Sequence, residues 1–303
     1  MRLAAMVLAT ALGWVTPSLA QDAGDEPALI EALVVNARTP GPAWWSVSKG
    51  SAKVWVLGVG VSVPADAKWD SKAFDRRVKA TRQVLVVPPS KTKLEGNLLK
   101  ADRDWRQELT EAERARVSEI AAAARRKPDF YSNYRPNFAG LLIKTDLDAR
   151  AKPQPGKSQD LQARARRLGA QIVPAGGEVA QGAKTGLELG GRDGLACVRW
   201  AIRPRDPVAM RQQRAQAWMN GDVRAIMLGP ATYDPCVQSI SSLQAASENS
   251  DGQMVDAIGA RLDRGEGAVA FVPLLALLRE GGVLDQLRKR GYRIENPAQI
   301  DDQ

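Results

Sequence analysis

The stretch from residue 42 to residue 64 places the strongest constraint on how this chain folds. It holds two apolar runs separated by a Lys-Gly-Ser turn at residues 49–51, and the second run extends over residues 54–63. Two such runs around a short turn predict a β-hairpin, and Gly58 and Gly60 predict a loop where the second strand ends. The remaining elements are therefore expected to assemble around this hairpin.

Helix and strand patterns alternate along the rest of the chain. A helical pattern precedes a short β-branched or apolar run at residues 70–87, 157–174 and 254–272. This alternation is typical of α/β proteins, in which helices pack on the faces of a sheet. The sequence therefore predicts an α/β fold with a single domain.

Other segments give weaker or purely local signals. Thr110 and Glu113 form a capping-box pattern at the start of a helix predicted over residues 110–127. The run at 195–202 is predicted to be a strand or another buried segment. Residues 148–156 and 239–252 are expected to be loops, because the first contains two prolines and the second is polar.

The first twenty residues have the features of a signal peptide. A single arginine precedes an apolar run over residues 3–15, and small residues stand before a predicted cleavage site between Ala20 and Gln21. The alternative is an uncleaved N-terminal membrane anchor. No later segment approaches the length of a transmembrane helix. We therefore expect an exported protein, periplasmic or secreted, in which residues 21–41 lead into the domain.

The chain contains two cysteines, Cys197 and Cys236. Export would place them in an oxidising compartment, so a disulfide is predicted, with two unpaired thiols as the alternative. The formal net charge of +9 favours anionic partners. Nucleic acid is not expected, because the basic residues are dispersed along the chain and lack interleaved aromatic residues.

Three separated blocks resemble the TraB/GumN family, which is related to the Tiki metalloproteases. The first is Pro-Ala-Trp-Trp-Ser-Val and the strand after it, within residues 42–64. The second is Ala-Trp-Met-Asn-Gly-Asp at residues 217–222, and the third ends in Arg-Gly-Tyr-Arg-Ile-Glu at residues 290–295. The resemblance implies one domain over residues 42–297, with a mixed central sheet covered by helices and a frayed tail at 298–303.

The resemblance also implies where a metal site would lie. Family members with intact motifs are thought to bind a divalent metal through histidines and glutamates and to hydrolyse amide bonds. The family's Gly-x-x-His pattern begins here at Gly58 and places its histidine position on Val61. The other ligand positions fall on Pro88, Gly176 and Ala276. None of these four side chains can coordinate a metal, so the resemblance predicts a vestigial site without a cofactor.

Composition narrows the chemistry further, because the 303 residues include no histidine. Histidine-dependent triads, dyads and metal sites are therefore excluded. Two hypotheses remain. The first is a catalytically inactive, exported protein that binds a peptide, an anionic polymer or a partner protein at the vestigial site. The alternative is a hydrolase with relocated groups. These could be carboxylates at Glu178, Glu188 and Asp193 or a serine–lysine pair, for which the candidates are Ser46 or Ser48 with Lys49, Ser51 with Lys53, and Ser62 with Lys68.

Overall fold

The computed structural model describes residues 28–87, 99–150, 160–175, 194–229, 235–238 and 241–300. Its described strands form one sheet in the order β4-β3-β5-β2-β1-β6. The strands are β1 (Trp44–Lys49), β2 (Ala52–Val59), β3 (Gln83–Val86), β4 (Gln171–Pro174), β5 (Ala268–Pro273) and β6 (Arg293–Glu295). The predicted hairpin is confirmed, because β1 pairs with β2 in antiparallel register around a turn at Gly50.

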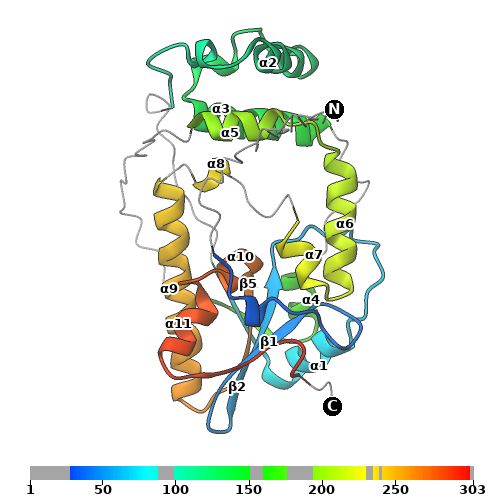
Figure 1. The fold of residues 1–303 in the computed structure, drawn as a ribbon. Coiled ribbons are helices and arrows are strands. Elements are labelled where there is room, and N and C mark those ends of the chain that lie inside the picture. Colours follow the sequence, from blue (N-terminus) through cyan, green and yellow to red (C-terminus); the bar gives the residue numbers. More distant parts are fainter. Residues whose placement is uncertain are drawn as a thin grey trace, which may run out of the picture.

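The sheet is mixed, as predicted for this fold class. β2, β5, β3 and β4 run parallel to one another, whereas β1 is antiparallel to both β2 and β6. The carboxyl ends of the four parallel strands therefore lie at one edge of the sheet, and Figure 1 shows β2 rising to that edge from the hairpin turn.

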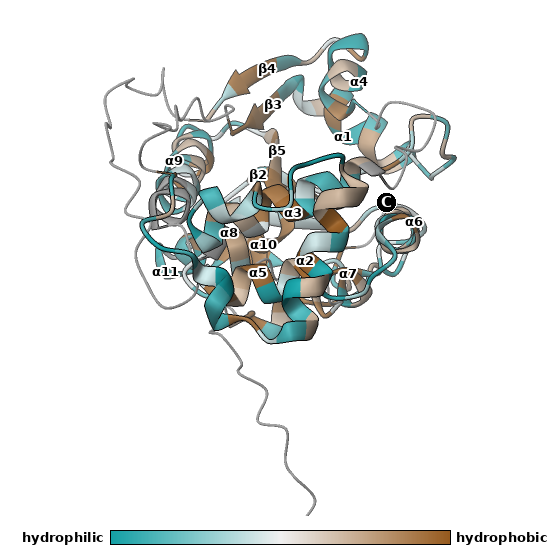
Figure 2. Cartoon of the chain, turned by 90° about the horizontal axis from the view of Figure 1, so that it is seen from above, coloured by the Kyte–Doolittle hydropathy of each residue, from teal (hydrophilic) through white to brown (hydrophobic). Residues whose placement is uncertain are grey.

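Helices cover both faces of the sheet, as Figures 1 and 2 show. Helices α9 and α11 lie on one side, and α1 and α4 lie on the other. Their bounds are α1 (Lys72–Thr81), α4 (Leu161–Arg167), α9 (Ser241–Asp263) and α11 (Val283–Lys289). Both faces of the central strand β5 are thereby largely removed from water, whereas β4, at one end of the sheet, stays partly exposed.

A second, smaller apolar core lies in a helical layer that we call the cap, residues 99–150 and 194–202. Its elements are η2 (Trp105–Glu108), α2 (Glu111–Ala123), η3 (Tyr131–Asn133), α3 (Pro136–Arg150) and α5 (Gly194–Ile202). The predicted capping box is confirmed at α2, where Thr110 and Glu113 exchange backbone and side-chain hydrogen bonds. Figures 1 and 2 show that the cap lies above the carboxyl ends of the parallel strands.

We call the sheet and the helices that cover it the body. The remaining elements link the cap to the body. They are η1 (Glu31–Leu33), α6 (Pro207–Met219), α7 (Val223–Met227), α8 (Pro235–Gln238) and α10 (Leu274–Leu278). The N-terminal segment packs into the body core through Ile30, Leu33 and Val34. At the other end of the chain, Ile300 is also buried in that core, within the segment that was expected to fray.

Residues 195–202, expected to be a strand or another buried segment, form helix α5, in which Cys197, Val198 and Ala201 are buried. Two loop predictions were wrong in part. Residues 241–252 belong to α9, which extends more than three turns before the buried stripe of Met254, Ile258 and Leu262. Residues 148–150 of the predicted loop at 148–156 belong to α3, and the rest of that segment lies outside the described residues.

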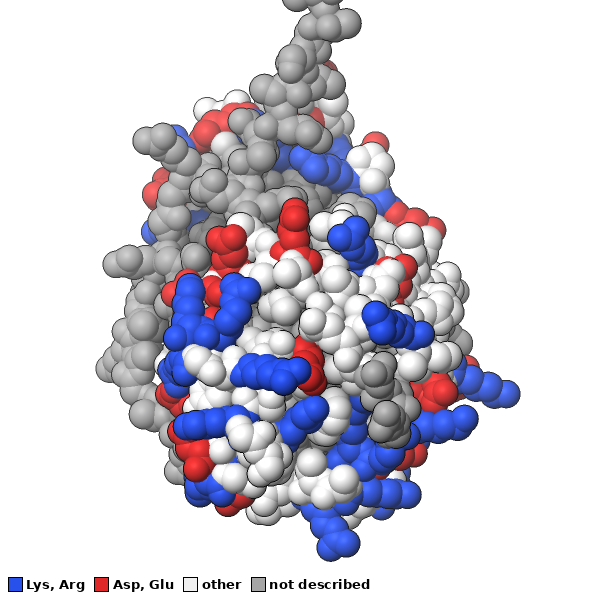
Figure 3. All heavy atoms as spheres, turned by 60° about the horizontal axis from the view of Figure 1, so that its bottom comes forward, with Lys and Arg blue, Asp and Glu red and all other residues white. Residues whose placement is uncertain are grey.

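The face of the body that includes the hairpin turn carries both signs of charge. Figure 3 shows Lys and Arg side chains with Asp and Glu side chains among them. Several are paired, as in Lys49 with Asp263 at 2.8 Å and Arg290 with Asp256 at 2.7 Å. Such exposed pairs contribute little to stability. Because acidic side chains lie among the basic ones, the positive charge of this face does not form one continuous patch.

Candidate functional site

The strand topology places the described site positions along one edge of the sheet. Gly58 and Val61 lie at and just after the end of β2, and Ala276 lies in α10, directly after β5. These two strands are adjacent and parallel, with Gly58 opposite Val272. Pro88 and Gly176 follow β3 and β4 in the sequence, but both lie outside the described residues. Ligand and catalytic sites of open α/β sheets are commonly built at the carboxyl ends of parallel strands.

Gly58 allows three elements to meet at the end of β2. A Cβ atom at this position would lie 2.3 Å from Leu274 Cδ2 and 3.2 Å from Trp45 Cζ3. The carbonyl oxygen of Gly58 accepts a hydrogen bond of 2.7 Å from Nε1 of Trp218, which belongs to α6. The edge of the sheet is thus fixed by close packing of α10 on one side and by a buried indole on the other.

The two described ligand positions have apolar surroundings. Val61 is partly buried and packs against the body core, and Ala276 is buried within it. Neither side chain carries an atom that can bind a metal ion. Among the described residues, no group of three or more His, Cys, Asp or Glu side chains could hold one. The described side chains at this edge therefore do not fit a divalent metal.

One buried ion pair lies one turn beyond Ala276. Arg279 Nη2 contacts Asp251 Oδ2 at 2.7 Å, and Asp251 is 3% exposed. Burial raises the pKa of Asp251, and the hydrogen bond and charge of Arg279 act against that rise. The pair joins α9 to the end of α10, so the Asp251 carboxylate is already paired with the Arg279 guanidinium.

Aromatic side chains pack beside the end of β2. The rings of Trp69 and Trp218 are 5.3 Å apart, and Trp69 also contacts Phe74 at 5.9 Å. Arg164 lies 5.6 Å from the Trp69 ring while it holds Asp75 through two hydrogen bonds. Sequence reasoning missed this cluster, because Trp69 lies in the irregular segment between β2 and α1.

Of the serine–lysine pairs proposed for a relocated hydrolase, Ser46 and Lys49 do not form hydrogen bonds with each other. Ser46 is fully buried and donates a hydrogen bond of 2.8 Å to Glu295, whereas Lys49 is exposed and pairs with Asp263. Both residues belong to β1, away from the edge at which β2 ends. The carboxylates proposed for the same role, Glu178, Glu188 and Asp193, lie outside the described residues.

A family model matches residues 43–296, and its description is the TraB/PrgY/gumN family. The chain belongs to this family. The match spans the hairpin, the cap and the C-terminal strand, and it confirms the resemblance drawn from the three sequence blocks. No curated protein and no solved structure matches the chain. The TraB/PrgY/gumN assignment therefore rests on the family model and on those blocks.

The predicted disulfide is also confirmed in this TraB/PrgY/gumN chain. Cys197 of α5 bonds to Cys236 of α8, with Cα atoms 4.5 Å apart, and both residues are fully buried. Helix α8 contacts α9 as well as α3 and α5. The disulfide therefore ties the cap to a segment that packs on the long helix of the body.

An open hollow of about 600 Å³ lies elsewhere on the body, between residues 29–32 and α11. Asp285 lines it and is held by the backbone N–H of Gly281 and by Lys289 at 2.7 Å. The hydrogen bond from Lys289 is the main cause that lowers the pKa of Asp285 to about 2. Because this carboxylate is satisfied within the chain, we assign no ligand to the hollow.

No helix among the described residues combines the length and the apolar character that crossing a bilayer requires. The predicted signal peptide at residues 1–20 and its cleavage site lie outside those residues.

Proposed function

We propose that this chain is a non-catalytic TraB/PrgY/gumN protein that binds a peptide, a polymer or a partner protein at the carboxyl edge of its parallel strands. The observation that carries the proposal is the replacement of ligand positions by Val61 and Ala276 in a chain with no histidine. Metal-assisted hydrolysis needs two or three convergent ligands and an open position for water. The apolar surroundings of both residues support a binding role for this edge.

The first test is the metal content of the purified chain after incubation with Mn²⁺, Co²⁺ and Zn²⁺, measured by elemental mass spectrometry after gel filtration. We expect no stoichiometric metal. One retained ion per chain would contradict the proposal and favour a hydrolase with relocated carboxylates.

A matched pair of variants would locate any retained ion. Asp251→Asn removes the buried acid near Ala276, and Asp285→Asn removes an acid of the hollow beside α11. Loss of metal in Asp251→Asn alone would assign the ion to the strand edge. Peptidase assays would then be the next measurement.

The binding role is tested with peptide and glycan arrays, because the ligand class at this edge is open. Val61→Glu places a charge at the end of β2 and should weaken capture by at least about tenfold, since the new carboxylate must be desolvated. Leu228→Glu is the control, because Leu228 is 70% exposed at the end of α7. Equal capture by Val61→Glu and the parent chain would place the ligand elsewhere.

We further propose that the protein is exported after cleavage between Ala20 and Gln21. The support is the short apolar run, the small residues before the cleavage site and the disulfide, which forms in oxidising compartments. N-terminal sequencing of the expressed protein should begin at Gln21. An intact Met1 in the exported fraction would contradict this.

A further inference from the structure

Arg205 lies in the short connection between α5 and α6, where the cap joins the body. Its guanidinium stacks on the ring of Trp200 at 4.6 Å. Two of its nitrogen atoms, Nε and Nη2, are shielded from solvent and have no hydrogen-bond partner. A buried donor without an acceptor is costly, and native proteins rarely keep one without a reason.

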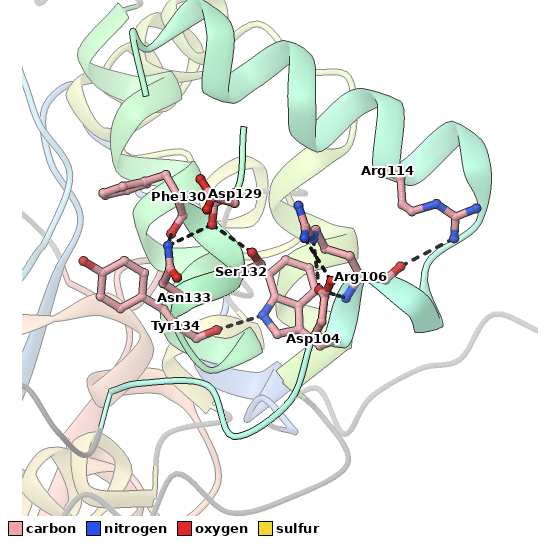
Figure 4. Close-up of polar contacts among 9 residues, drawn as sticks. Asp104, Arg106, Arg114, Asp129, Phe130, Ser132, Asn133 and Tyr134 are labelled. Carbon is pink, nitrogen blue, oxygen red and sulfur yellow. Dashed lines mark hydrogen bonds and ion pairs between the residues drawn. The ribbon is translucent and has the colours of Figure 1, made fainter. Parts of the chain in front are cut away.

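These two nitrogen atoms form the side of the guanidinium that grips a carboxylate through two parallel hydrogen bonds. Four other arginines in the described part of the chain use the same two atoms in that way. Figure 4 shows one of them, Arg106, with Nε and Nη2 both 2.9 Å from Asp104. The others are Arg126 on Asp146, Arg164 on Asp75 and Arg264 on Glu266.

The neighbouring acid does not serve Arg205. Oδ1 of Asp206 accepts hydrogen bonds from the backbone N–H groups of Val208 and Ala209, at 2.9 and 3.0 Å, and so caps α6. Arg199, on α5, is already paired with Glu113. The two buried nitrogen atoms of Arg205 therefore have no acceptor in the described part of the chain.

We propose that Arg205, held against Trp200, binds a carboxylate group that comes from outside the chain. The flat guanidinium is fixed by the indole, so little side-chain entropy is lost when its two N–H groups engage a planar carboxylate. The source is either a small free carboxylate or an acidic side chain of a peptide or protein. This site is separate from the strand edge at Val61 and Ala276, and it does not depend on the function proposed for that edge.

The experiment follows the arginine Nε–Hε signals of the ¹⁵N-labelled chain by NMR, with the Arg205 signal assigned by its loss in Arg205→Lys. The probes are acetate, glutarate, a hexaglutamate peptide and inorganic phosphate, each added at constant ionic strength. We expect the Arg205 signal to shift saturably with the carboxylates. Arg203→Gln is the matched control, and the Arg205 signal should respond in it as in the parent chain.

Affinity for the carboxylate probe, measured by calorimetry, should fall by about tenfold or more in Arg205→Lys, because a lysine cannot form the bidentate contact. A clear preference for hexaglutamate over acetate would identify a peptide or protein as the source, and comparable affinities would identify a small carboxylate. Phosphate binding with no response to carboxylates would overturn the proposal, as would an Arg205 signal that no probe moves.

Thermal melting separates binding from a structural role. Arg205→Met removes the two buried donors and keeps an apolar side chain over Trp200. We expect it to melt at or above the temperature of the parent chain without ligand, and to lose the stabilisation that a bound carboxylate gives the parent chain. A marked drop in melting temperature without ligand would show that Arg205 serves the fold instead.

Discussion

The body and the cap are held together by different means. The body is built on strand pairs that join distant parts of the sequence, such as Val54 of β2 opposite Ala268 of β5. The cap has no strand of the sheet. Its helices α3 and α5 pack closely around Gly140, and a disulfide at Cys197 ties them to α8.

This difference explains where the family resemblance lies. The three sequence blocks that carry it fall on the hairpin, on the end of α6 and on the segment from β5 to β6, all in the body. Each of them fixes the edge at which Gly58, Val61 and Ala276 lie. The family model spans the cap as well, but no quoted motif falls within residues 99–150. The residues that carry the resemblance therefore lie in the body.

The largest effect should come from removing the link between the two regions. The double variant Cys197→Ser with Cys236→Ser removes the disulfide, which joins residues 39 positions apart in the sequence. The chain-entropy model predicts a loss of roughly 3–4 kcal/mol in the free energy of unfolding. Hydrogen exchange should rise first in α3 and α5, which contact the disulfide segment, and least in β2 and β5. Equal loss of protection in cap and body would show that the two regions unfold as one unit.

A smaller loss is expected from Gly140→Ala, which acts within the cap. The added Cβ would lie 2.1 Å from Cys197 Sγ and 2.9 Å from the Cys197 carbonyl carbon, so α3 and α5 must move apart. We expect a cost of about 2–3 kcal/mol, measured by denaturant unfolding. Gly252→Ala is the matched control in α9, because no atom lies within 4 Å of the added Cβ. The control should stabilise the chain by about 0.5–1 kcal/mol.

Sequence reasoning succeeded where the signal was local. The hairpin around residues 49–51 and the capping box of Thr110 and Glu113 depend on residues a few positions apart. The α/β class could be predicted for the same reason, because the helix and the strand of each pair follow one another directly in the sequence. The segment 195–202 shows the limit: a short apolar run satisfies both the helical and the strand period, and packing against α3 decides between them.

The site could be predicted only as a set of positions. Of the matched residues, Gly58, Val61 and Ala276 fall on one sheet edge because they lie at or after the ends of the adjacent parallel strands β2 and β5, and that placement depends on topology. The contacts that complete the edge join residues far apart in sequence. Trp218 and Gly58 are 160 residues apart, and Arg279 and Asp251 are 28 apart. No local pattern indicates which of these side chains will meet.

The next prediction concerns charge in the body. The carboxyl of Asp285 has a pKa of about 2 in the folded chain, below its ordinary value of 3.8. A lowered pKa adds stability above about pH 4, and that stability is lost as the pH falls toward 2. Asp285→Asn should lower the free energy of unfolding by about 1–2 kcal/mol at pH 7. The loss is limited to this size because the partners Arg288 and Lys289 are largely exposed and screened by water. Denaturant unfolding at pH 7 and pH 2.5 should show the difference from the parent chain shrinking.

The smallest effects give the sharpest comparison of the two regions. Thr110 is the N-cap residue of α2, in the cap, and accepts a hydrogen bond of 3.2 Å from the N–H of Glu113. Asp160 is the N-cap residue of α4, in the body, and accepts a hydrogen bond of 2.8 Å from the N–H of Ala163. Both contacts are exposed, so Thr110→Ala and Asp160→Ala should each cost about 1 kcal/mol. The question is which part of the molecule loses that stability.

Native-state hydrogen exchange answers it. If the cap opens without the body, Thr110→Ala should speed exchange in α2 and α3 and leave β3 and β5 unchanged, since those strands exchange only on global unfolding. Asp160→Ala should leave the free energy of cap opening unchanged, because α4 packs on β4 of the body. If each variant instead speeds exchange in both regions by the same factor, the disulfide and α9 couple them into one cooperative unit. The cap would then be as fixed above the strand edge as the sheet is beneath it.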